Sequence, residues 1–485
     1  MTRFRTGLAL LLLLAATVAR AQHPRPDVAE AFEEALRAPE LKGGVQGIVV
    51  ESLEDGSVWY ERNRDLFLIP ASNQKLLTSA AALALLGPGW RFHTEVLRAA
   101  GGLGAGVLRG PLWLRGGGDP TLDIAHLDRL ARAVRQAGIV HITGGLVADD
   151  SLFDAQRHGD GWSWNYLSEH YAAPVSALSL AGNVLRVTKS PGRSAGDPVR
   201  ARIEPAASGV PVVVRARTAP AGARRTIRAT RQLGRSLVVV EGLLPLDATP
   251  DARPALVAVE DPARFAAHVF VDRLRRAGVR VEGGVRLGKT PAAARPVAVH
   301  ASEPLGDLLH RMNKPSDNLF AECLFRILGA RRSGVGSFRA ARGAVRSWLD
   351  SVGVPAAEID MTDGSGLSRL NGVTAGALAR LLHVMHARPE AAAWIASLPV
   401  AGVDGTLRNR MRGTPAAGNL RAKTGYVGYV SALSGYVSTA DGVPLVLVIL
   451  MNHHRTTNAV ARGIQDRLVA YLAAYRSPSP QGGAQ

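Results

Sequence analysis

The stretch "PASNQKLLTSAAAL" (70–83) places Ser72 and Lys75 three positions apart at the predicted start of an apolar helix. Residues at this spacing lie on the same helical face. A buried lysine can have its pKa lowered enough to accept the proton of a serine hydroxyl, which is otherwise a weak nucleophile. The pair is either an ordinary helix start or a nucleophile beside its own base. The S-x-x-K pattern is common by chance and does not decide between them.

A second candidate is the segment "NKPSDNLF" (313–320), which we expect to form a turn between two helices because Pro315 ends the first one. The ordinary interpretation is helix capping, in which Ser316 or Asn318 accepts a hydrogen bond from backbone N–H groups of the next helix. In the functional interpretation, Ser316 relays a proton to a leaving group, and Asn318 binds a substrate carbonyl or the lysine.

The third candidate is "RAKTGYVGYV" (421–430), a predicted strand on which Lys423 and Thr424 point to opposite faces. Gly425 would let a ligand backbone approach closely. A cation and a hydroxyl at a sheet edge suit a terminal carboxylate, and an extended edge can bind a peptide by strand addition. The alternative is an edge lysine that discourages aggregation.

In this chain order, S-x-x-K, S-D-N and K-T-G resemble the three-part signature of penicillin-binding proteins and serine β-lactamases. The long spacing from Ser72 to Ser316 leaves room for an insert, as in the low-molecular-mass class C penicillin-binding proteins, the D-alanyl-D-alanine carboxypeptidase/endopeptidases. Further stretches resemble that family over nearly the whole mature chain: "GGGDPTL" (116–122), "GLVADDSLFD" (145–154), "GWSWNYL" (161–167), "APVSALSLAGN" (173–183), "DGSGLSRLN" (363–371) and "VAGVDGTLRNR" (400–410).

The resemblance implies a catalytic role for three residues. Ser72 would attack the carbonyl of a D-Ala-D-Ala bond, Lys75 would be the general base, and Ser316 would pass a proton to the departing amine. The oxyanion would lie between the backbone N–H groups of Ser72 and Tyr426, and water would release the acyl group. The implied partners are peptidoglycan stem peptides and, as covalent inhibitors, β-lactam antibiotics. No cofactor is implied.

The resemblance also implies a set of substrate-binding residues: Asn318, Lys423, Thr424, Gly425, Tyr426, Ser365 and Arg369. Asn318 would position the substrate amide, and Lys423 and Thr424 would hold the terminal carboxylate. Ser365 and Arg369 belong to a segment that lines the cleft in the family. Arg369 could equally form a surface ion pair.

The resemblance and the pattern of helical and strand-like segments predict an α+β fold. A serine β-lactamase/transpeptidase-like domain, with an antiparallel sheet flanked by helices, would be interrupted by a mostly β insert of one or two small domains. The expected divisions are a signal peptide (1–21), the two parts of the penicillin-binding domain (22–90 and 259–476), the insert (91–258) and a disordered tail (477–485).

The N-terminus predicts export to the periplasm or another extracytoplasmic place. Arg3 and Arg5 precede an apolar run and the A-x-A cleavage motif at 19–21. No later stretch is long and apolar enough to cross a bilayer. The net charge of +18 suggests an acidic partner, but the basic residues are scattered without interleaved aromatic residues. We therefore do not expect nucleic acid as a partner.

Two further residue types are expected to be structural. Cys323 is the only cysteine, so no intramolecular disulfide can form, and its apolar helical neighbours predict a buried thiol. His383 and His386 lie three positions apart on a predicted helix. We expect no nearby carboxylate partner for them and hence no metal site.

Two rival functions remain open from sequence. A serine β-lactamase would share the acylation step, but no "E-x-x-L-N" segment, the source of the class A deacylating glutamate, occurs between Ser72 and Ser316. A non-catalytic cell-wall-binding protein of the same fold is disfavoured because all three motifs are intact. A homo-oligomer is compatible with either.

Overall fold

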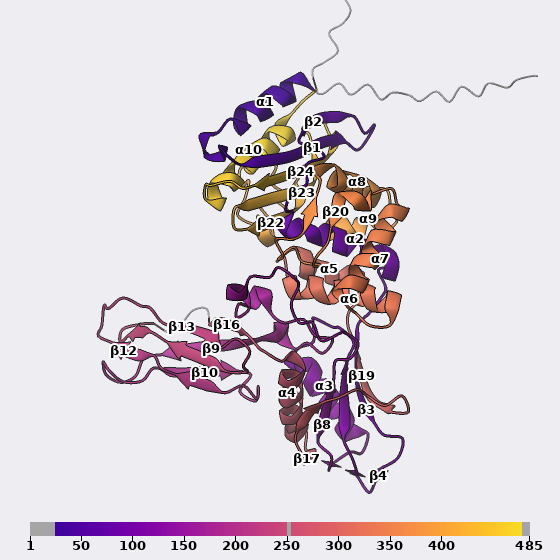
Figure 1. Ribbon diagram of the computed structural model, residues 1–485, viewed down its shortest axis with the longest axis vertical. Coiled ribbons are helices and arrows are strands. Elements are labelled where there is room, and N and C mark those ends of the chain that lie inside the picture. The colour runs from indigo at the N-terminus through magenta and orange to yellow at the C-terminus, as the bar shows by residue number, and fades with distance from the viewer. Residues whose placement is uncertain (1–24, 250–253, 478–485) are drawn as a thin grey trace, which may run out of the picture.

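The computed structural model describes residues 25–249 and 254–477. The predicted signal peptide (1–21) and all but the first residue of the predicted tail (477–485) lie outside these ranges. The described chain forms a lobe around one antiparallel sheet, an α/β layer below it and a small β module that projects to one side (Figure 1). Among the described residues, no helix has the length and apolar character needed to cross a membrane.

Both ends of the chain contribute to the central sheet, whose strand order is β2-β1-β24-β23-β22. Every neighbouring pair is antiparallel, and β1 pairs with β24 over its full length. The strands are β1 (Val45–Ser52), β2 (Val58–Arg62), β22 (Arg421–Val427), β23 (Val430–Ser438) and β24 (Pro444–Asn452). Strand β22 is therefore an edge of the sheet, as the sequence predicts.

Helices cover both faces of this sheet, which explains why β24 reads as a nearly continuous apolar run. Leu447 and Ile449 point to the core beneath α1 (Pro26–Leu36) and α10 (Asn458–Ala474), whereas Val446 and Val448 point to the opposite core. The second core is covered by α2 (Gln74–Leu86), α5 (Leu305–Asn313), α6 (Asn318–Ser333), α7 (Phe338–Ser351), α8 (Ala375–His386) and α9 (Ala391–Ser397). A short ribbon of β20 (Ile359–Asp360) and β21 (Gly372–Val373) lies beside α8. The predicted α+β architecture is confirmed.

The insert begins with an α/β layer whose main sheet has the order β18-β8-β6-β3-β19. Its strands are β3 (His93–Arg98), β6 (Leu112–Gly116), β8 (Leu146–Asp149), β18 (Val285–Leu287) and β19 (Arg295–Ala301). A smaller sheet joins β4 (Leu103–Gly104), β5 (Val107–Leu108), β7 (His141–Ile142) and β17 (Arg280–Val281). Helices α3 (Ile124–Gln136) and α4 (Pro262–Arg276) pack together against this layer.

These pairings move the second domain boundary. Strand β19 pairs with β3, and β18 pairs with β8, so residues 262–301 fold with the insert although they follow its β-rich part in the chain. The expected boundary at 258 falls inside this layer. We propose a boundary near Ser302 instead. Below, the sheet lobe means residues 25–90 and 302–477, and the insert means residues 91–301.

A second part of the insert, the side module (residues 184–249 and 254–258), has short strands and no helix among its described residues. One sheet joins β10 (Arg200–Glu204), β9 (Val184–Ser190) and β16 (Ala255–Ala258), and a second joins β11 (Val212–Val214), β14 (Val238–Glu241) and β13 (Arg228–Arg231). Strands β12 (Arg217–Ala219) and β15 (Leu243–Pro245) form a further pair. Figure 1 shows this module projecting to the left of the α/β layer.

Arg326 on α6 fixes the insert to the sheet lobe. Its guanidinium is fully buried and donates to the backbone carbonyls of Gly336 and Gln156 and to the Asp154 carboxylate. It also lies over the rings of Phe153 and Phe338. Because a buried charge is tolerated only when it is paired, this arrangement holds residues 153–156 of the insert against the helix that carries the second motif.

Candidate active site

The three motifs meet at the edge of the central sheet. Ser72 lies in a single 3₁₀ turn (Ala71–Asn73) that leads into α2, and Lys75 is the second residue of that helix. Ser316 lies between α5 and α6, and Lys423 lies on edge strand β22. The turn that carries Ser72 packs directly against β22 and β23. Residues separated by as many as 351 positions are thus brought into one cluster.

Lys75 is the centre of the hydrogen-bond network. Its Nζ lies 3.0 Å from Ser72 Oγ, 2.6 Å from Asn318 Oδ1 and 2.7 Å from the backbone oxygen of Ser365. A neutral amine has two N–H groups and one lone pair. Because the amide and carbonyl oxygens can only accept, they take both N–H groups and leave the lone pair facing the Ser72 hydroxyl. The network therefore orients a neutral Lys75 as a base toward Ser72.

Burial prepares Lys75 for this role. The side chain is fully buried, and loss of hydration lowers the pKa of Lys75 to about 8, although the carboxylates of Glu322, Asp363 and Asp317 oppose this shift. An ordinary lysine would be almost entirely protonated at neutral pH. At a pKa of about 8, roughly one tenth of the amine is neutral at pH 7. A catalytic base gains most when its pKa lies near the working pH.

Asp317, rather than Ser316 or Asn318, caps helix α6. Its carboxylate accepts from the backbone N–H of Phe320 at 2.9 Å. The capping alternative for the other two residues is therefore wrong, and both side chains are free for the cluster. Ser316 has a φ of 65°, which non-glycine residues seldom adopt, and its Oγ accepts from Lys423 Nζ at 2.9 Å. Strained backbone of this kind is common at functional sites.

Lys423 is a second buried lysine in the cluster that contains Lys75. Burial, and then the positive charge of Lys75, hold the pKa of Lys423 well below its ordinary value. Its Nζ also donates to the backbone oxygen of Thr424 at 2.9 Å. The Thr424 hydroxyl lies 2.7 Å from that of Thr406, and Tyr426 is half-exposed. The site therefore holds two buried amines, and an anionic group bound beside them would favour their protonated forms.

Gly425 allows a close approach, but the segment that approaches it is the chain's own backbone. A Cβ at this position would lie 2.6 Å from the Pro70 carbonyl oxygen and 3.2 Å from the Ala71 Cβ. The approach expected for a ligand is thus made by the turn that precedes Ser72. Any side chain at 425 would push the nucleophile's turn away from the sheet edge.

Ser365 and Arg369 occupy different environments. Ser365 is fully buried, its hydroxyl accepts from the Leu367 N–H at 3.2 Å, and its carbonyl oxygen faces Lys75. Arg369 is exposed and donates through both terminal nitrogens, at 2.9 Å each, to the backbone oxygen of Gly428. Arg369 thus links its loop to the turn after β22, and the surface ion pair considered for it is absent from the described residues.

Glu322 is the residue that the sequence analysis missed. It lies one helical turn after Asn318 on α6 and is fully buried. Its two carboxylate oxygens accept from the backbone N–H groups of Gly364 and Ser365 at 3.0 and 2.8 Å. Burial, and then the charge of Asp363, raise the pKa of Glu322. The signal in the sequence was an acidic residue within the mostly apolar stretch "NLFAECLFRIL" (318–328).

Asp363 secures the other side of the same loop. Its carboxylate accepts from the backbone N–H groups of Gly366 and Ser368, from the Asn371 amide and from the Trp162 indole, at 2.7 to 2.8 Å. Four donors satisfy a fully buried carboxylate. Since Trp162 belongs to the insert, the loop that contacts Lys75 is held from both the sheet lobe and the insert.

With this geometry established, comparison with known proteins is informative. A model of the D-Ala-D-Ala carboxypeptidase 3 (S13) family matches residues 28–475. The chain belongs to this family. Its relative from Actinomadura sp. (strain R39), a D-alanyl-D-alanine carboxypeptidase, is 38% identical over 473 residues, covering 95% of this chain and 87% of the relative. D-alanyl-D-alanine carboxypeptidase DacB of Haemophilus influenzae is 29% identical over 437 residues, covering 89% and 90%.

Solved structures extend the family likeness to three dimensions. The crystal structure of penicillin binding protein 4 (dacB) from Haemophilus influenzae matches with a TM-score of 0.83 at 28% identity, covering 92% of this chain and 99% of that chain. The same protein complexed with a novel β-lactam matches with a TM-score of 0.78 at 26% identity and the same coverage. The predicted family and the expected serine β-lactamase/transpeptidase-like fold are confirmed.

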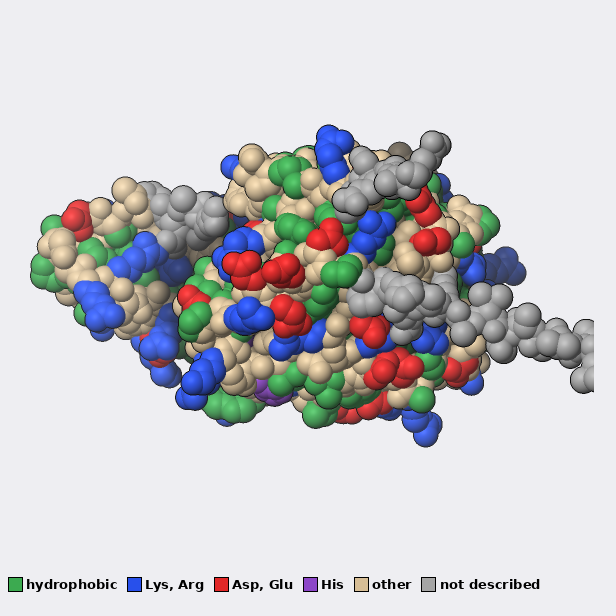
Figure 2. Space-filling model, turned by 90° about the horizontal axis from the view of Figure 1, so that it is seen from above, with side chains coloured by type: hydrophobic (Ala, Val, Ile, Leu, Met, Phe, Trp, Pro, Cys, Tyr) green, Lys and Arg blue, Asp and Glu red, His purple; other side chains and the backbone are tan. Residues whose placement is uncertain are grey.

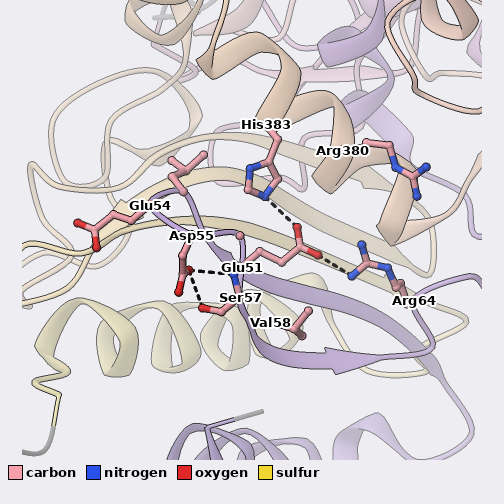
Figure 3. A pocket seen from close by; sticks show the side chains of 10 residues that line it. Glu51, Glu54, Asp55, Ser57, Val58, Arg64, Arg380 and His383 are labelled. Atoms are coloured by element: carbon pink, nitrogen blue, oxygen red, sulfur yellow. Dashed lines mark hydrogen bonds and ion pairs between the residues drawn. The ribbon is translucent and has the colours of Figure 1, made fainter. Parts of the chain in front are cut away.

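A separate hollow lies between the β1–β2 hairpin and α8, apart from the residues of the three motifs (Figure 3). Within it, the Glu51 carboxylate lies between Arg64 Nη1 at 2.6 Å and His383 Nε2 at 2.9 Å. The expectation that His383 has no carboxylate partner is therefore wrong. Across the described ranges, no group of three or more His, Cys, Asp or Glu side chains is placed to hold a metal. Cys323 is fully buried, as predicted.

Proposed function

We propose that this chain is an exported serine peptidase that cleaves D-Ala-D-Ala bonds of peptidoglycan stem peptides through an acyl-enzyme and is inhibited by penicillin. The observation that carries the proposal is Lys75 Nζ at 3.0 Å from Ser72 Oγ, with its other two contacts made to acceptors. Membership of a D-Ala-D-Ala carboxypeptidase family supports the substrate class. The β-lactam complex of the Haemophilus influenzae relative supports the inhibitor class.

In the first step, neutral Lys75 removes the Ser72 hydroxyl proton while the serine oxygen bonds to the carbonyl carbon of the penultimate D-Ala. The resulting oxyanion accepts from the backbone N–H groups of Ser72 and Tyr426, which stabilise charge that forms only in the transition state. Asn318 and Ser365 act through Lys75, because their oxygens hold its two N–H groups.

In the second step, the tetrahedral intermediate collapses and the C–N bond breaks. The proton taken by Lys75 passes through the Ser316 hydroxyl to the departing amine of D-Ala. Lys423 and Thr424 hold the terminal carboxylate, for which the buried ammonium of Lys423 provides a charge-assisted partner. Water then attacks the ester, the acyl group leaves as a carboxylate, and Ser72 regains its proton.

The proposed substrates include cross-links between a D-Ala and a diamino acid, which would make the enzyme an endopeptidase as well as a carboxypeptidase. Arg369 is exposed beside the Gly428 turn and is the proposed contact for the stem-peptide side chain. The proposed place of action is extracytoplasmic, because the substrate lies outside the cytoplasmic membrane.

The test is incubation of the purified protein with muropeptide monomers and dimers, with the products read by mass. Loss of one terminal D-Ala from monomers is the expected result, and conversion of dimers to monomers would show endopeptidase activity. The Ser72→Ala variant must be inactive on both. Intact substrates after prolonged incubation with the wild-type protein would contradict the proposal, and rapid hydrolysis of penicillin without peptide cleavage would indicate a β-lactamase.

A further inference from the structure

The side module carries a large share of the positive charge of the chain. The described residues of the module, 184–249 and 254–258, contain twelve Arg and Lys against four Asp and Glu, a net charge of +8 out of the +18 of the whole sequence. Eleven of the twelve are arginines, and these residues include no Phe, Trp or Tyr. The catalytic network uses none of these residues, so the charge of this module needs a separate explanation.

Strand register places several of these arginines on one outer face. Arg200 and Arg202 alternate along β10, and Arg186 lies on the neighbouring strand β9 opposite Glu204. All three arginines are exposed, whereas the alternate residues of β9, Leu185, Val187 and Lys189, are buried. Among the described residues, the ion pair on this face is the weak contact of 3.5 Å between Arg202 and Glu204. Like charges that share a sheet face repel each other, so the face remains positive and incompletely neutralised.

The positive charge continues around the module. Arg228 is exposed on β13 in the second sheet, and its nearest carboxylate, that of Glu241, is 3.7 Å away. Exposed arginines also occupy the connecting segments, at Arg193, Arg215, Arg224 and Arg235. In Figure 2, the lobe at the left, which is this module, carries several blue side chains and few red ones. The basic groups thus lie on both sheets and on the turns rather than on a single plane.

We propose that the side module is a docking surface for a flexible phosphodiester polymer of the cell envelope, of the poly(glycerol phosphate) class. Arginine presents a planar fork of donors that binds phosphate oxygens in a bidentate manner. The preference for Arg over Lys runs through the whole chain, but the module concentrates the charge, with +8 on 71 residues against +18 on all 485. A flexible chain can follow arginines around the module, whereas a flat membrane contacts one face. The lack of aromatic side chains removes both membrane-interface anchors and platforms for stacked nucleic acid bases.

The side module contacts a segment that also reaches the active-site cluster. A polymer bound to the module would therefore stay close to that cluster. Buried Arg231 donates to the carbonyls of Leu167 and Ala258, and the Ala258 N–H donates to the Ser168 carbonyl. A few residues further along this segment, the Tyr171 carbonyl accepts from the Asn318 amide of the active-site cluster. A polymer bound to the module therefore keeps the catalytic site near the wall, where tethering raises the effective concentration of stem peptides.

The test measures binding of the full mature chain to fluorescently labelled poly(glycerol phosphate) over a series of salt concentrations. The module variant is Arg186→Gln/Arg200→Gln/Arg202→Gln. A matched control, Arg339→Gln/Arg342→Gln/Arg467→Gln, removes three exposed charges from the sheet lobe and so makes the same change in net charge. Vesicles of phosphatidylglycerol and phosphatidylcholine form a second arm, and the rate of penicillin acylation is recorded for each protein.

The wild-type protein should bind the polymer with an affinity that falls steeply with salt. The module variant should lose at least about tenfold in affinity, and its log–log salt slope should fall by about 3, one for each phosphate contact removed. The control should change less than about twofold, and acylation should be the same in all three proteins. Equal losses in both variants, or binding to vesicles as tight as to the polymer, would overturn the proposal. Failure of acylation alone would instead count against the proposed peptidase.

Discussion

Lys75 in the sheet lobe and Arg202 in the side module are both cations, but their surroundings differ in every respect. Lys75 is fully buried, and its Nζ lies 2.6 to 3.0 Å from two acceptor oxygens and from the Ser72 hydroxyl. Arg202 is exposed, and the Glu204 carboxylate lies 3.5 Å away. Burial changes the pKa of a group and fixes the orientation of its side chain, whereas exposure leaves a charge free to attract ions at a distance. Under the two proposals, the sheet lobe serves chemistry and the side module serves attraction.

We expect the greatest loss of activity when the side chain of Lys75 is removed. Lys75→Ala should lower the rate of acylation by penicillin by about 10²- to 10⁴-fold, because a positioned general base contributes that much. Stopped-flow acylation and circular dichroism would be measured on the same preparations. A folded Lys75→Ala protein that acylates at the normal rate would show that another group is the base.

The second prediction distinguishes substrate binding from the chemical step by a substitution at Lys423 in the same buried cluster. Lys423→Ala should mainly weaken substrate capture, by about 10- to 100-fold in kcat/KM, because a charge-assisted hydrogen bond to the terminal carboxylate is lost. The change should fall on KM more than on kcat for D-Ala release. A loss confined to kcat, with KM unchanged, would contradict the role of Lys423 as a carboxylate ligand.

The third prediction concerns the effect of the buried Glu322 carboxylate on the pKa of Lys75. The acylation rate of the wild-type protein should rise with pH, with a midpoint near the Lys75 pKa of about 8, since only the neutral amine accepts the proton. Glu322→Gln removes a carboxylate that raises the pKa of Lys75, so the midpoint should move to lower pH. The maximal rate should also fall about tenfold, because the loop at 364–365 loses a charged acceptor.

The control for this shift is Glu358→Gln. Glu358 accepts from the Thr374 hydroxyl at 2.7 Å, outside the catalytic cluster, so it offers the same chemical change at a different place. Its pH profile should match that of the wild-type protein. If both variants shift alike, or if Glu322→Gln leaves the midpoint in place, Glu322 does not act on Lys75.

The smallest expected effect lies in the side module. Arg200→Gln should change the free energy of unfolding by no more than about 0.5 kcal/mol, because its side chain is exposed and, within the described part of the chain, donates to the Pro191 carbonyl alone. Urea unfolding would show this. A large destabilisation would mean that the module's arginines serve its own folding, and the contrast between the two regions would fail.

Local signals in the sequence were enough to place the three motifs in their structural settings. The stop at Pro315, the apolar spacing after Ser72 and the alternation around Lys423 each depend on a few neighbouring residues, and all three segments lie where they were expected. The three-motif pattern also supplied the family, because order and spacing in the chain survive without any structure.

Non-local packing decided the rest. We propose the boundary near Ser302 rather than at 258 because helix α4 packs on α3, which lies about 140 positions earlier, and composition does not show such a contact. The sequence predicted Ser316 or Asn318 as the possible helix cap, whereas Asp317 is the cap in the structure. Three adjacent polar residues could each cap a helix, and the choice depends on the backbone conformation at Ser316, which the sequence does not show. The partner of His383 lies on a strand 332 positions away.

Acylation of Ser72 is the step on which the proposed peptidase depends, and mass spectrometry reads it directly. The protein and its Ser72→Ala variant are incubated with penicillin, and the intact mass and the peptide containing residues 70–83 are measured. We predict a long-lived adduct of one penicilloyl group on Ser72 in the wild-type protein and none in the variant. An unlabelled wild-type protein, or an adduct on another residue, would contradict this prediction.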